Sequence, residues 1–167
     1  MHRLLLLTLV LAACGTDDGV EGESATTSTA ARVPPPASVS PDEFRSLRWL
    51  EGSWRGLDDG GQAFYERYSF VDDSTIRAQS SPDSTFPTVD GASEIRLRGG
   101  RVTTGDEGME WTVTAITQGG VRFDPVRGAR NSFEWRRESD DEWLATLQWV
   151  TSSGERQERR YTMRRMQ

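Results

Sequence analysis

The sequence contains no lysine: all 20 cationic residues are arginine, and there is one cysteine and one histidine. Without lysine, neither Schiff-base chemistry nor a P-loop lysine is available. The histidine, His2, and the cysteine, Cys14, both lie near the N-terminus. If His2 is removed with an N-terminal signal and Cys14 is modified, the remaining chain has no histidine and no free thiol. It could then form no Ser-His-Asp triad, no zinc site built on histidine or thiolate, and no histidine-ligated haem site. We therefore expect no catalytic residues, no cofactor and no metal site.

A short apolar run follows a basic start and ends at the cysteine. Residues 4–11 (LLLLTLVL) come after Arg3, and two alanines precede Cys14. The run is much shorter than the ~20 residues that cross a bilayer, and its layout is typical of a secretion signal. Because it ends at a single cysteine, it resembles the lipobox of bacterial lipoproteins. The alternative is an ordinary secretion signal with a chance cysteine.

The lipobox resemblance implies that Cys14 is acylated and becomes the first residue of the mature chain. We accordingly expect a signal peptide over residues 1–13 and a location in the cell envelope, with the protein held to a membrane by acyl chains. Gly15, rather than an aspartate, follows the cysteine. By analogy with sorting in enteric bacteria, this favours the outer membrane where the host has one.

Negative charge predominates in the chain, which has a formal net charge of −6 at pH 7. Nucleic-acid binders normally carry a basic patch or stripe, so we expect no nucleic-acid partner. The acidity also gives no attraction to anionic lipid, so a membrane association would depend on the acyl chains. The sequence does not indicate an oligomeric state.

Residues 14–41 differ in composition from the rest of the chain. They contain no aromatic residue and consist mostly of Gly, Ser, Thr, Ala and Pro. Such a segment cannot bury enough apolar surface to offset the entropy lost on ordering. We interpret it as the lipidated cysteine followed by a flexible, disordered tether, which leads to a domain over residues 42–167.

The domain begins with a helical signal and continues with strand signals. Pro41-Asp42-Glu43-Phe44 predicts one or two helical turns with Ser40 as the N-cap. After Gly52 the pattern changes to short alternating runs separated by Gly, Asp and Ser turns, which is typical of an antiparallel sandwich or barrel. The predicted strands are 53–57, 63–71, 75–80, 93–98, 110–117, 121–124, 132–138, 142–151 and 156–165. Residues 80–91 are predicted to be a loop at the mouth of a barrel.

Residues 47–56 (LRWLEGSWRG) resemble the opening of a calycin barrel. In the lipocalin, fatty-acid-binding and nitrobindin-like families, a short helix leads into Gly-x-Trp on the first strand, here Gly52-Ser53-Trp54. The resemblance covers most of residues 44–166 and extends to bacterial lipocalin-like domains, which share the aromatic-Glu-x-aromatic strand found at 65–68. It implies an all-β fold: an antiparallel calycin-like barrel of about 8–10 strands with a short N-terminal helix.

The same resemblance implies that the tryptophan closes one end of the barrel and that a cation of the final strand covers its ring. Tyr161, Met163 and Arg165 alternate and so share one face of the last predicted strand. We expect Gly52, Trp54 and Arg165 to form this structural signature, with Arg164 as the alternative cation. Because the chain lacks the histidine that holds haem in nitrobindins, haem binding is not carried over.

The candidate ligand-binding residues are aromatic, apart from one acid. Glu66 alternates with aromatic residues, and on an inward face its pKa would be raised unless an arginine pairs with it; we favour a structural ion pair. The indoles could line a cavity or fill the core, and barrels of about this size do either. The candidates are Glu66, Tyr68, Trp111, Trp135 and Trp149.

Three functional hypotheses follow. The first is a cell-envelope lipoprotein that binds a small apolar or amphipathic ligand in the barrel. The second is a structural or interaction lipoprotein with a filled barrel and a protein partner. The third is an enzyme that uses Glu66 with Tyr68 for proton transfer, which ranks last because no second poised group is evident. A cavity of some hundreds of Å³ would favour the first over the second.

Overall fold

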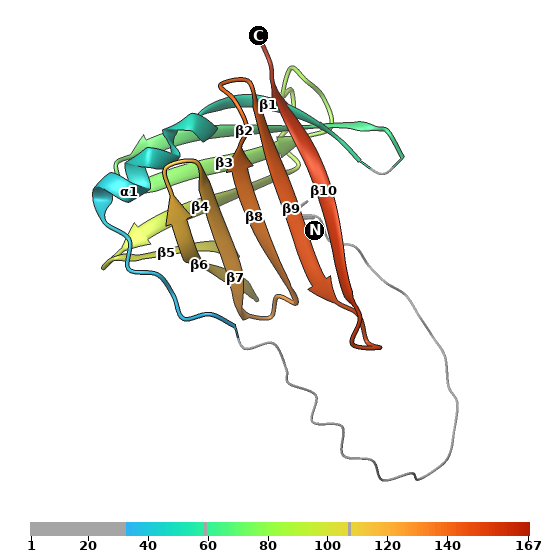
Figure 1. The fold of residues 1–167 in the computed structure, drawn as a ribbon. Helices are drawn as coiled ribbons and strands as arrows, with labels where there is room; N and C mark the ends of the chain where they lie inside the picture. The colour runs from blue at the N-terminus through green and yellow to red at the C-terminus, as the bar shows by residue number, and fades with distance from the viewer. Residues whose placement is uncertain (1–32, 59, 107) are drawn as a thin grey trace, which may run out of the picture.

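The computed structural model describes residues 33–58, 60–106 and 108–167 and shows an all-β closed barrel (Figure 1). Every neighbouring pair of strands is antiparallel, in the order β1-β10-β9-β8-β7-β6-β5-β4-β3-β2. The strands are β1 (Gly52–Leu57), β2 (Ala63–Asp72), β3 (Thr75–Ser81), β4 (Gly91–Arg98), β5 (Arg101–Asp106), β6 (Met109–Thr117), β7 (Gly120–Arg127), β8 (Asn131–Arg137), β9 (Glu142–Val150) and β10 (Arg156–Arg165). The predicted fold class is confirmed.

The barrel has one strand more than the nine predicted, because β5 was missed. Its sequence, RVTTGD, has a single large apolar residue, Val102, so the apolar alternation that identifies a strand is weak. Val102 and Thr104 are nevertheless buried, since β5 lies between β4 and β6 in the barrel wall. Its strand structure therefore comes from pairing with its neighbours more than from its own pattern.

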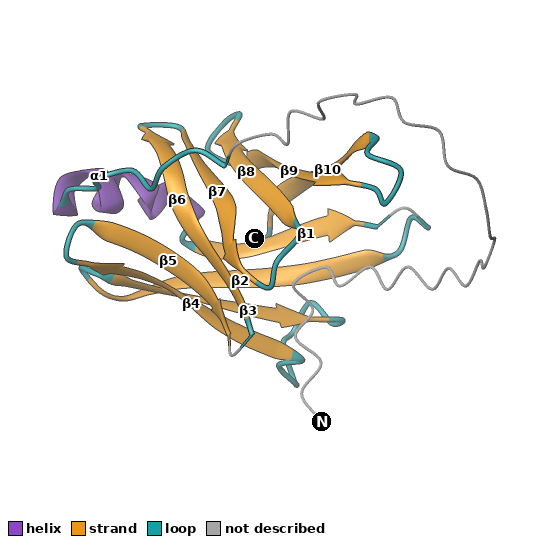
Figure 2. Cartoon of the chain, turned by 90° about the horizontal axis from the view of Figure 1, so that it is seen from below, coloured by secondary structure: helices purple, strands orange, loops and turns teal. Residues whose placement is uncertain are grey.

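A short helical segment lies at one end of the barrel, which we call the helix end (Figure 2). It consists of α1 (Pro41–Arg45) and the 3₁₀ helix η1 (Ser46–Leu50). Ser40 caps α1 as predicted: its Oγ accepts a 3.2 Å hydrogen bond from the Glu43 amide, and Glu43 Oε2 accepts one of 2.8 Å from the Ser40 amide. Within the described residues, no helix is long and apolar enough to cross a bilayer.

The chain before α1 already packs against the barrel. The Ala37 amide donates to the Val113 carbonyl at 2.9 Å, and the Val39 amide donates to the Gly100 carbonyl at 2.8 Å. Val39 is buried in the core. The last residues of the segment that we assigned to the tether thus contribute to the folded domain, while residues 14–32 lie outside the described residues.

The first and last strands meet around Trp54. Trp54 and Arg165 are direct cross-strand partners, and the Arg165 guanidinium carbon lies 4.2 Å from the Trp54 ring centroid. The indole itself is buried and donates to the Leu50 carbonyl at 2.7 Å. The stacking expected for this pair is therefore present, with Arg165 rather than Arg164 as the cation.

Arg165 also holds the helical segment to the barrel. Its Nη1 donates to the Glu51 carbonyl at 2.8 Å and its Nη2 to the Trp49 carbonyl at 3.1 Å. The close approach requires glycine at position 52, where φ is +129° and a Cβ would lie 2.5 Å from Arg165 Nη1. Three expected residues, Gly52, Trp54 and Arg165, thus join the helix, β1 and β10.

Aromatic rings fill the barrel near the helix end. Trp143 is the centre of this packing, because its ring lies 5.5–6.1 Å from those of Trp49, Trp54, Tyr68 and Trp135. Most of these pairs meet edge to face, the favoured arrangement of aromatic rings. The indole N–H groups of Trp49 and Trp143 have no hydrogen-bond partner among the described residues. This half of the barrel is a packed core.

Removing the Trp54 side chain should destabilise the domain far more than removing the cation above it. We expect Trp54→Ala to lower the free energy of unfolding by about 3–5 kcal/mol, because it leaves a large buried void. Arg165→Ala should cost about 1–2 kcal/mol through the lost cation–π contact. Urea unfolding followed by tryptophan fluorescence measures both.

Arg164→Ala is the matched control, since Arg164 lies on the outer face and pairs with Glu142 at 3.2 Å in an exposed ion pair. It should change the stability by less than about 0.5 kcal/mol. Equal effects of Arg164→Ala and Arg165→Ala would contradict the role assigned to Arg165.

Candidate functional site

The strand register identifies the side chains that point into the barrel. Trp54, whose ring is in the core, lies opposite Glu66, and Glu66 lies opposite Ser80 on the next strand. Direct cross-strand partners share one face of an antiparallel sheet. Glu66 and Ser80 therefore point inward. This is the orientation considered for Glu66 in the sequence analysis, in which it shares an inward face with Phe64 and Tyr68.

Inward-facing side chains become more exposed with distance from the helix end. Along β10, Met163 and Tyr161 are buried, whereas Arg159 is partly exposed; along β9, Trp143 is buried and Trp149 is partly exposed. Solvent therefore reaches the inner face of the barrel in the half farther from the helix. We use the name far-end wall for some of the partly exposed inward residues of this half, namely Phe64, Glu66, Ser80, Ser93, Leu147, Trp149 and Arg159.

An acid and a phenol form a hydrogen-bonded pair inside the barrel. The Tyr68 hydroxyl donates to Glu66 Oε2 at 2.7 Å. Burial of the carboxyl group raises the pKa of Glu66 above its ordinary value of 4.5, and this hydrogen bond offsets part of the rise. Burial, followed by the nearby Glu66 charge, raises the pKa of Tyr68 well above 10.0. The pair can accept a hydrogen bond from a polar group that enters the barrel, or donate one to it.

The expected ion pair between Glu66 and an arginine is not what the structure shows. In the described residues, the hydrogen bond that Glu66 accepts comes from Tyr68. The physical reason is the register: Ser80, not an arginine, stands opposite Glu66 on β3, and Trp54 stands opposite it on β1. A neutral hydroxyl donor leaves the carboxyl with its desolvation only partly compensated.

The far-end wall also contains a cation that the sequence analysis did not single out. Arg159 Nη1 donates to the Tyr161 hydroxyl at 3.4 Å, and the Arg159 guanidinium lies 5.9 Å from the Trp149 ring centroid. Tyr161 in turn meets Phe64 edge to face at 5.7 Å. The alternation already recognised at Tyr161, Met163 and Arg165 would have found Arg159 if it had been followed two residues earlier.

The five candidate ligand-binding residues separate into two groups. Tyr68, Trp111 and Trp135 are buried, with exposures of 4%, 3% and 8%, and belong to the packed core. Glu66 and Trp149 belong to the far-end wall and are partly exposed as residues, although the carboxyl group of Glu66 is itself buried. Direct ligand contact stays a prediction for all five, and access is easiest at the two wall residues.

The loop at residues 82–90 is attached to the outside of the barrel. Phe86, in a left-handed conformation with φ +54°, lies beneath the Arg67 guanidinium at 4.1 Å from its ring centroid. Arg67 alternates with the inward-facing Glu66 and therefore points outward. Phe86 is thus a packing contact on the outer surface.

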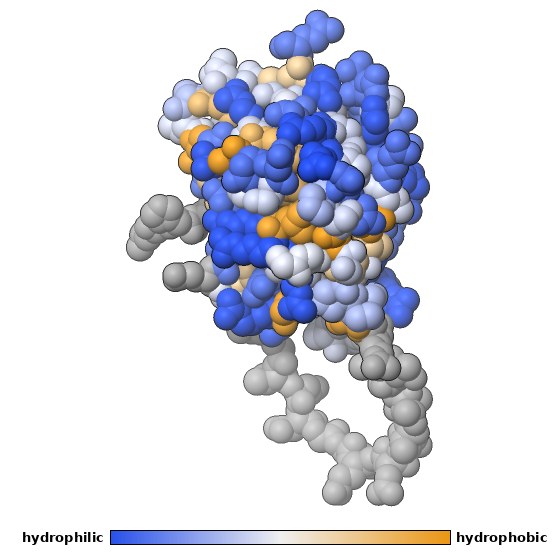
Figure 3. All heavy atoms as spheres, turned by 90° about the vertical axis from the view of Figure 1, so that its left-hand side faces the viewer, coloured by the Kyte–Doolittle hydropathy of each residue, from blue (hydrophilic) through white to orange (hydrophobic). Residues whose placement is uncertain are grey.

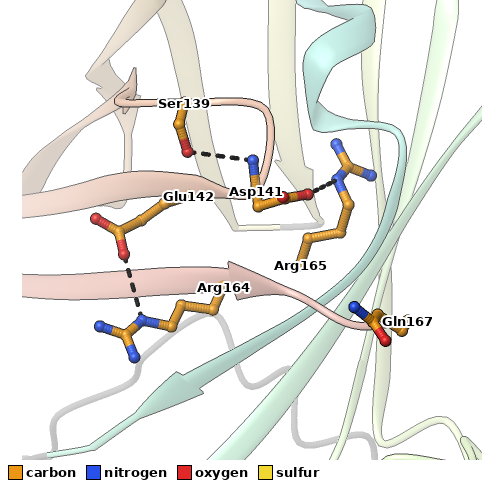
Figure 4. A pocket seen from close by; sticks show the side chains of 6 residues that line it. All are labelled: Ser139, Asp141, Glu142, Arg164, Arg165 and Gln167. Atoms are coloured by element: carbon orange, nitrogen blue, oxygen red, sulfur yellow. Dashed lines mark hydrogen bonds and ion pairs between the residues drawn. The ribbon is translucent and has the colours of Figure 1, made fainter.

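A polar hollow of about 420 Å³ lies outside the barrel at the helix end (Figure 4). Its ion pairs join Glu142 to Arg164 at 3.2 Å and Asp141 to Arg165 at 3.6 Å. The Asp141 amide also donates to Ser139 Oγ at 3.2 Å. These groups already pair with one another, and the contacts of Arg165 with Asp141 and with the Asp140 carbonyl, at 2.9 Å, help to hold Arg165 over Trp54.

The described residues contain no cluster of metal ligands, and the face drawn in Figure 3 shows no large apolar patch. Among the described residues, no three acidic, histidine or cysteine side chains come together as metal ligands would. On the face over α1 and the neighbouring strands, hydrophilic residues predominate and apolar ones form small separate areas (Figure 3). Cys14, the predicted lipidation site, lies outside the described residues.

No protein-family model and no curated protein matches the sequence. Among solved structures, the chain is similar to a DUF3598-family protein of unknown function from Nostoc punctiforme, with a TM-score of 0.49 and 15% identity over 82% of this chain and 53% of that one. It thus spans about half the length of that protein. It is also similar to EF1p2_mFAP2b bound to DFHBI (TM-score 0.38, 12% identity, 74% and 99% covered) and to a redesigned β-barrel, mFAP1, bound to DFHBI (0.35, 14%, 73% and 99%).

Neutralising Glu66 should stabilise the fold at neutral pH. A carboxyl whose pKa is higher in the folded state gives its full contribution to stability below its unfolded value near 4.5, and this contribution is lost as the pH rises through the folded value. Glu66→Gln imitates the protonated form. Its melting temperature should therefore exceed that of the wild type at neutral pH, and the difference should disappear at about pH 4.

Glu158→Gln provides a control of opposite sign. Hydrogen bonds from Gln148 lower the pKa of the exposed Glu158, with a smaller contribution from Arg160, so its charge supports the folded state at neutral pH and this support is lost on acidification. Glu158→Gln should lower the melting temperature at neutral pH. A lower melting temperature for Glu66→Gln as well would contradict the desolvation assigned to Glu66.

Proposed function

We propose that this protein is a lipid-anchored protein of the cell envelope that binds a small amphipathic ligand in the far half of its barrel. Residues 1–13 act as the signal peptide, Cys14 carries the acyl chains, and the following residues tether the barrel to the membrane. The barrel holds the ligand without chemical conversion. The apolar part of the ligand lies against Phe64, Leu147 and Trp149.

The observation that carries this proposal is the change in burial along the inside of the barrel. A barrel with a purely structural role would be filled throughout, as this one is around Trp143. In the far half, however, inward-facing aromatic and aliphatic side chains remain partly exposed beside an acid and a cation, Glu66 and Arg159. A few polar groups among apolar ones are the usual composition of a small-molecule site.

The alternative, a structural or interaction lipoprotein with a protein partner, is supported by the packed half. There the aromatic side chains leave no accessible inner surface, and the barrel wall could serve as a rigid scaffold. Binding measurements separate the two functions, because a ligand binder must lose affinity when the far half is filled, whereas a scaffold has no affinity to lose.

Filling the far half should weaken ligand binding strongly. We expect the full chain to bind dansyl-labelled undecanoic acid, with a blue shift and enhancement of dansyl emission. Ser80→Trp should weaken this binding by about tenfold or more, because the indole occupies the space between the walls. Gln79→Trp, the matched control, adds the same indole on the outer face of the same strand.

Equal affinity of the two tryptophan variants would place the probe outside the barrel. Absence of binding to the wild type, together with no ligand on the protein from its host, would favour the scaffold alternative. Circular dichroism of both variants establishes that each retains its β structure.

The anchor is tested separately by Cys14→Ser. The acylated protein should fractionate with membranes, and Cys14→Ser should leave an unprocessed or soluble form, because one thiol carries the acyl chains. Mass spectrometry of the N-terminal peptide identifies the modification. A Cys14→Ser chain that is still processed and still sediments with membranes would contradict the lipoprotein assignment.

A further inference from the structure

The barrel wall is incomplete between β4 and β5. Their ladder contains the pairs Arg96–Thr103, Leu97–Val102 and Arg98–Arg101 and stops there. Both strands continue toward the far end, but β4 pairs only with β3 and β5 only with β6.

The backbone of Glu94 faces this break. The Leu97 amide donates to Ser74 on the β3 side, and alternate residues of a strand direct their backbone groups to opposite sides. The backbone groups of Glu94 therefore point toward β5, which no longer pairs with β4 there.

Gly105 lies on β5, two residues beyond the last pair with β4 and opposite Glu110 on β6. Its φ is +123°, and a Cβ at this position would lie 2.1 Å from the Met109 carbonyl oxygen. Only glycine accepts both this backbone conformation and this close approach without strain. Glycine at position 105 therefore allows β5 to approach β6 closely beside the break.

A hollow of about 220 Å³ lies at the break, and most of its lining residues belong to the outer face of the wall. It is lined by Arg77, Ala92, Ser93, Glu94, Arg96 and Gly105. Ser93 is opposite Ala78, which is opposite the inward-facing Tyr68, so Ser93 belongs to the inner face. Its neighbours Ala92 and Glu94 belong to the outer face.

Two cations and one acid stand on the outer side of the hollow. Glu94 pairs with Arg77 at 3.3 Å through Oε1 and with Arg96 through Oε2. Both arginine side chains are nearly half exposed, and together they exceed the acid by one positive charge on a protein whose net charge is negative.

We propose that the ligand is an anionic amphiphile that enters through the opening between β4 and β5. Its head group remains at Arg77 and Arg96 on the outer surface, and its apolar chain passes Ser93 to the far-end wall. This inference rests on the function proposed above and specifies the route and the charge of the ligand.

The charges of this site suit an anionic head group. Guanidinium groups form their strongest hydrogen bonds with carboxylates and phosphates, and Glu94 can release one of two partners while keeping the other. The carboxylate of a fatty acid and the phosphate of a lysophospholipid share this chemistry. Comparing the two compounds as competitors of the probe shows which class is preferred.

The head-group test uses the dansyl-labelled undecanoic acid and its uncharged methyl ester. Arg77→Gln and Arg96→Gln should each weaken binding of the acid by about three- to tenfold and leave the ester unchanged. Glu94→Gln should strengthen binding of the acid by a few fold. The matched control is Arg98→Gln, which removes an outer-face arginine of the same strand beyond the hollow.

The route is tested by covering the outside of the opening. Ala92→Trp places an indole at the hollow without entering the barrel, so it should slow association and dissociation of the ester alike, by about tenfold, with little change in its affinity. Ala115→Trp, at an exposed outward position on β6, should leave both rates unchanged. Stopped-flow fluorescence of the full chain measures these rates.

The outcomes separate this inference from the function on which it rests. Loss of probe binding in Ser80→Trp, with no effect of substitutions at Arg77, Arg96 and Ala92, would keep the barrel as the binding site and overturn entry between β4 and β5. Equal loss of acid and ester binding in the arginine variants would overturn the head-group assignment. Absence of all probe binding, together with no ligand on the protein from its host, would overturn both.

Discussion

The Arg165 guanidinium connects the last strand to the first strand and to the helical segment, at the place where the barrel closes. It covers the Trp54 ring and donates to the carbonyls of Glu51 and Trp49. β1 and β10 share only two register pairs, Trp54–Arg165 and Arg55–Arg164. Closure of the ring of strands is therefore concentrated at the helix end, where one cation, one indole and one glycine meet.

This concentration gives the two halves of the barrel different roles. Near the helix end, aromatic packing and the guanidinium contacts fix the strands, and a rigid core leaves no accessible inner surface. Toward the far end, β10 runs beyond the end of β1, and β4 separates from β5. The partly exposed inward residues lie in the far half, away from the β1–β10 pairs and the Arg165 contacts. A stable half thus supports an accessible one, as binding proteins require of a preformed site.

The sequence predicted much of the fold but less of the site. The resemblance of Gly52-Ser53-Trp54 to calycin barrels implied the closure contact, and the alternation ending at Arg165 identified the cation, because alternation determines which face each side chain takes. The β5 strand was not predicted because Val102 is its only large apolar residue and because its structure depends on pairing with the neighbouring strands. The partner of Glu66 and the opening beside Gly105 depend on register between strands, which alternation within one strand does not reveal.

We propose that the far half of the barrel holds a ligand, whereas the half near the helix is packed. Native mass spectrometry of the full chain, extracted from the membranes of its own host, tests this most directly. We predict a complex carrying a small acidic amphiphile in addition to the acyl chains at Cys14, and loss of that mass in Ser80→Trp but not in Gln79→Trp. A single species with the mass of the acylated chain alone, from wild type and variants alike, would contradict the claim.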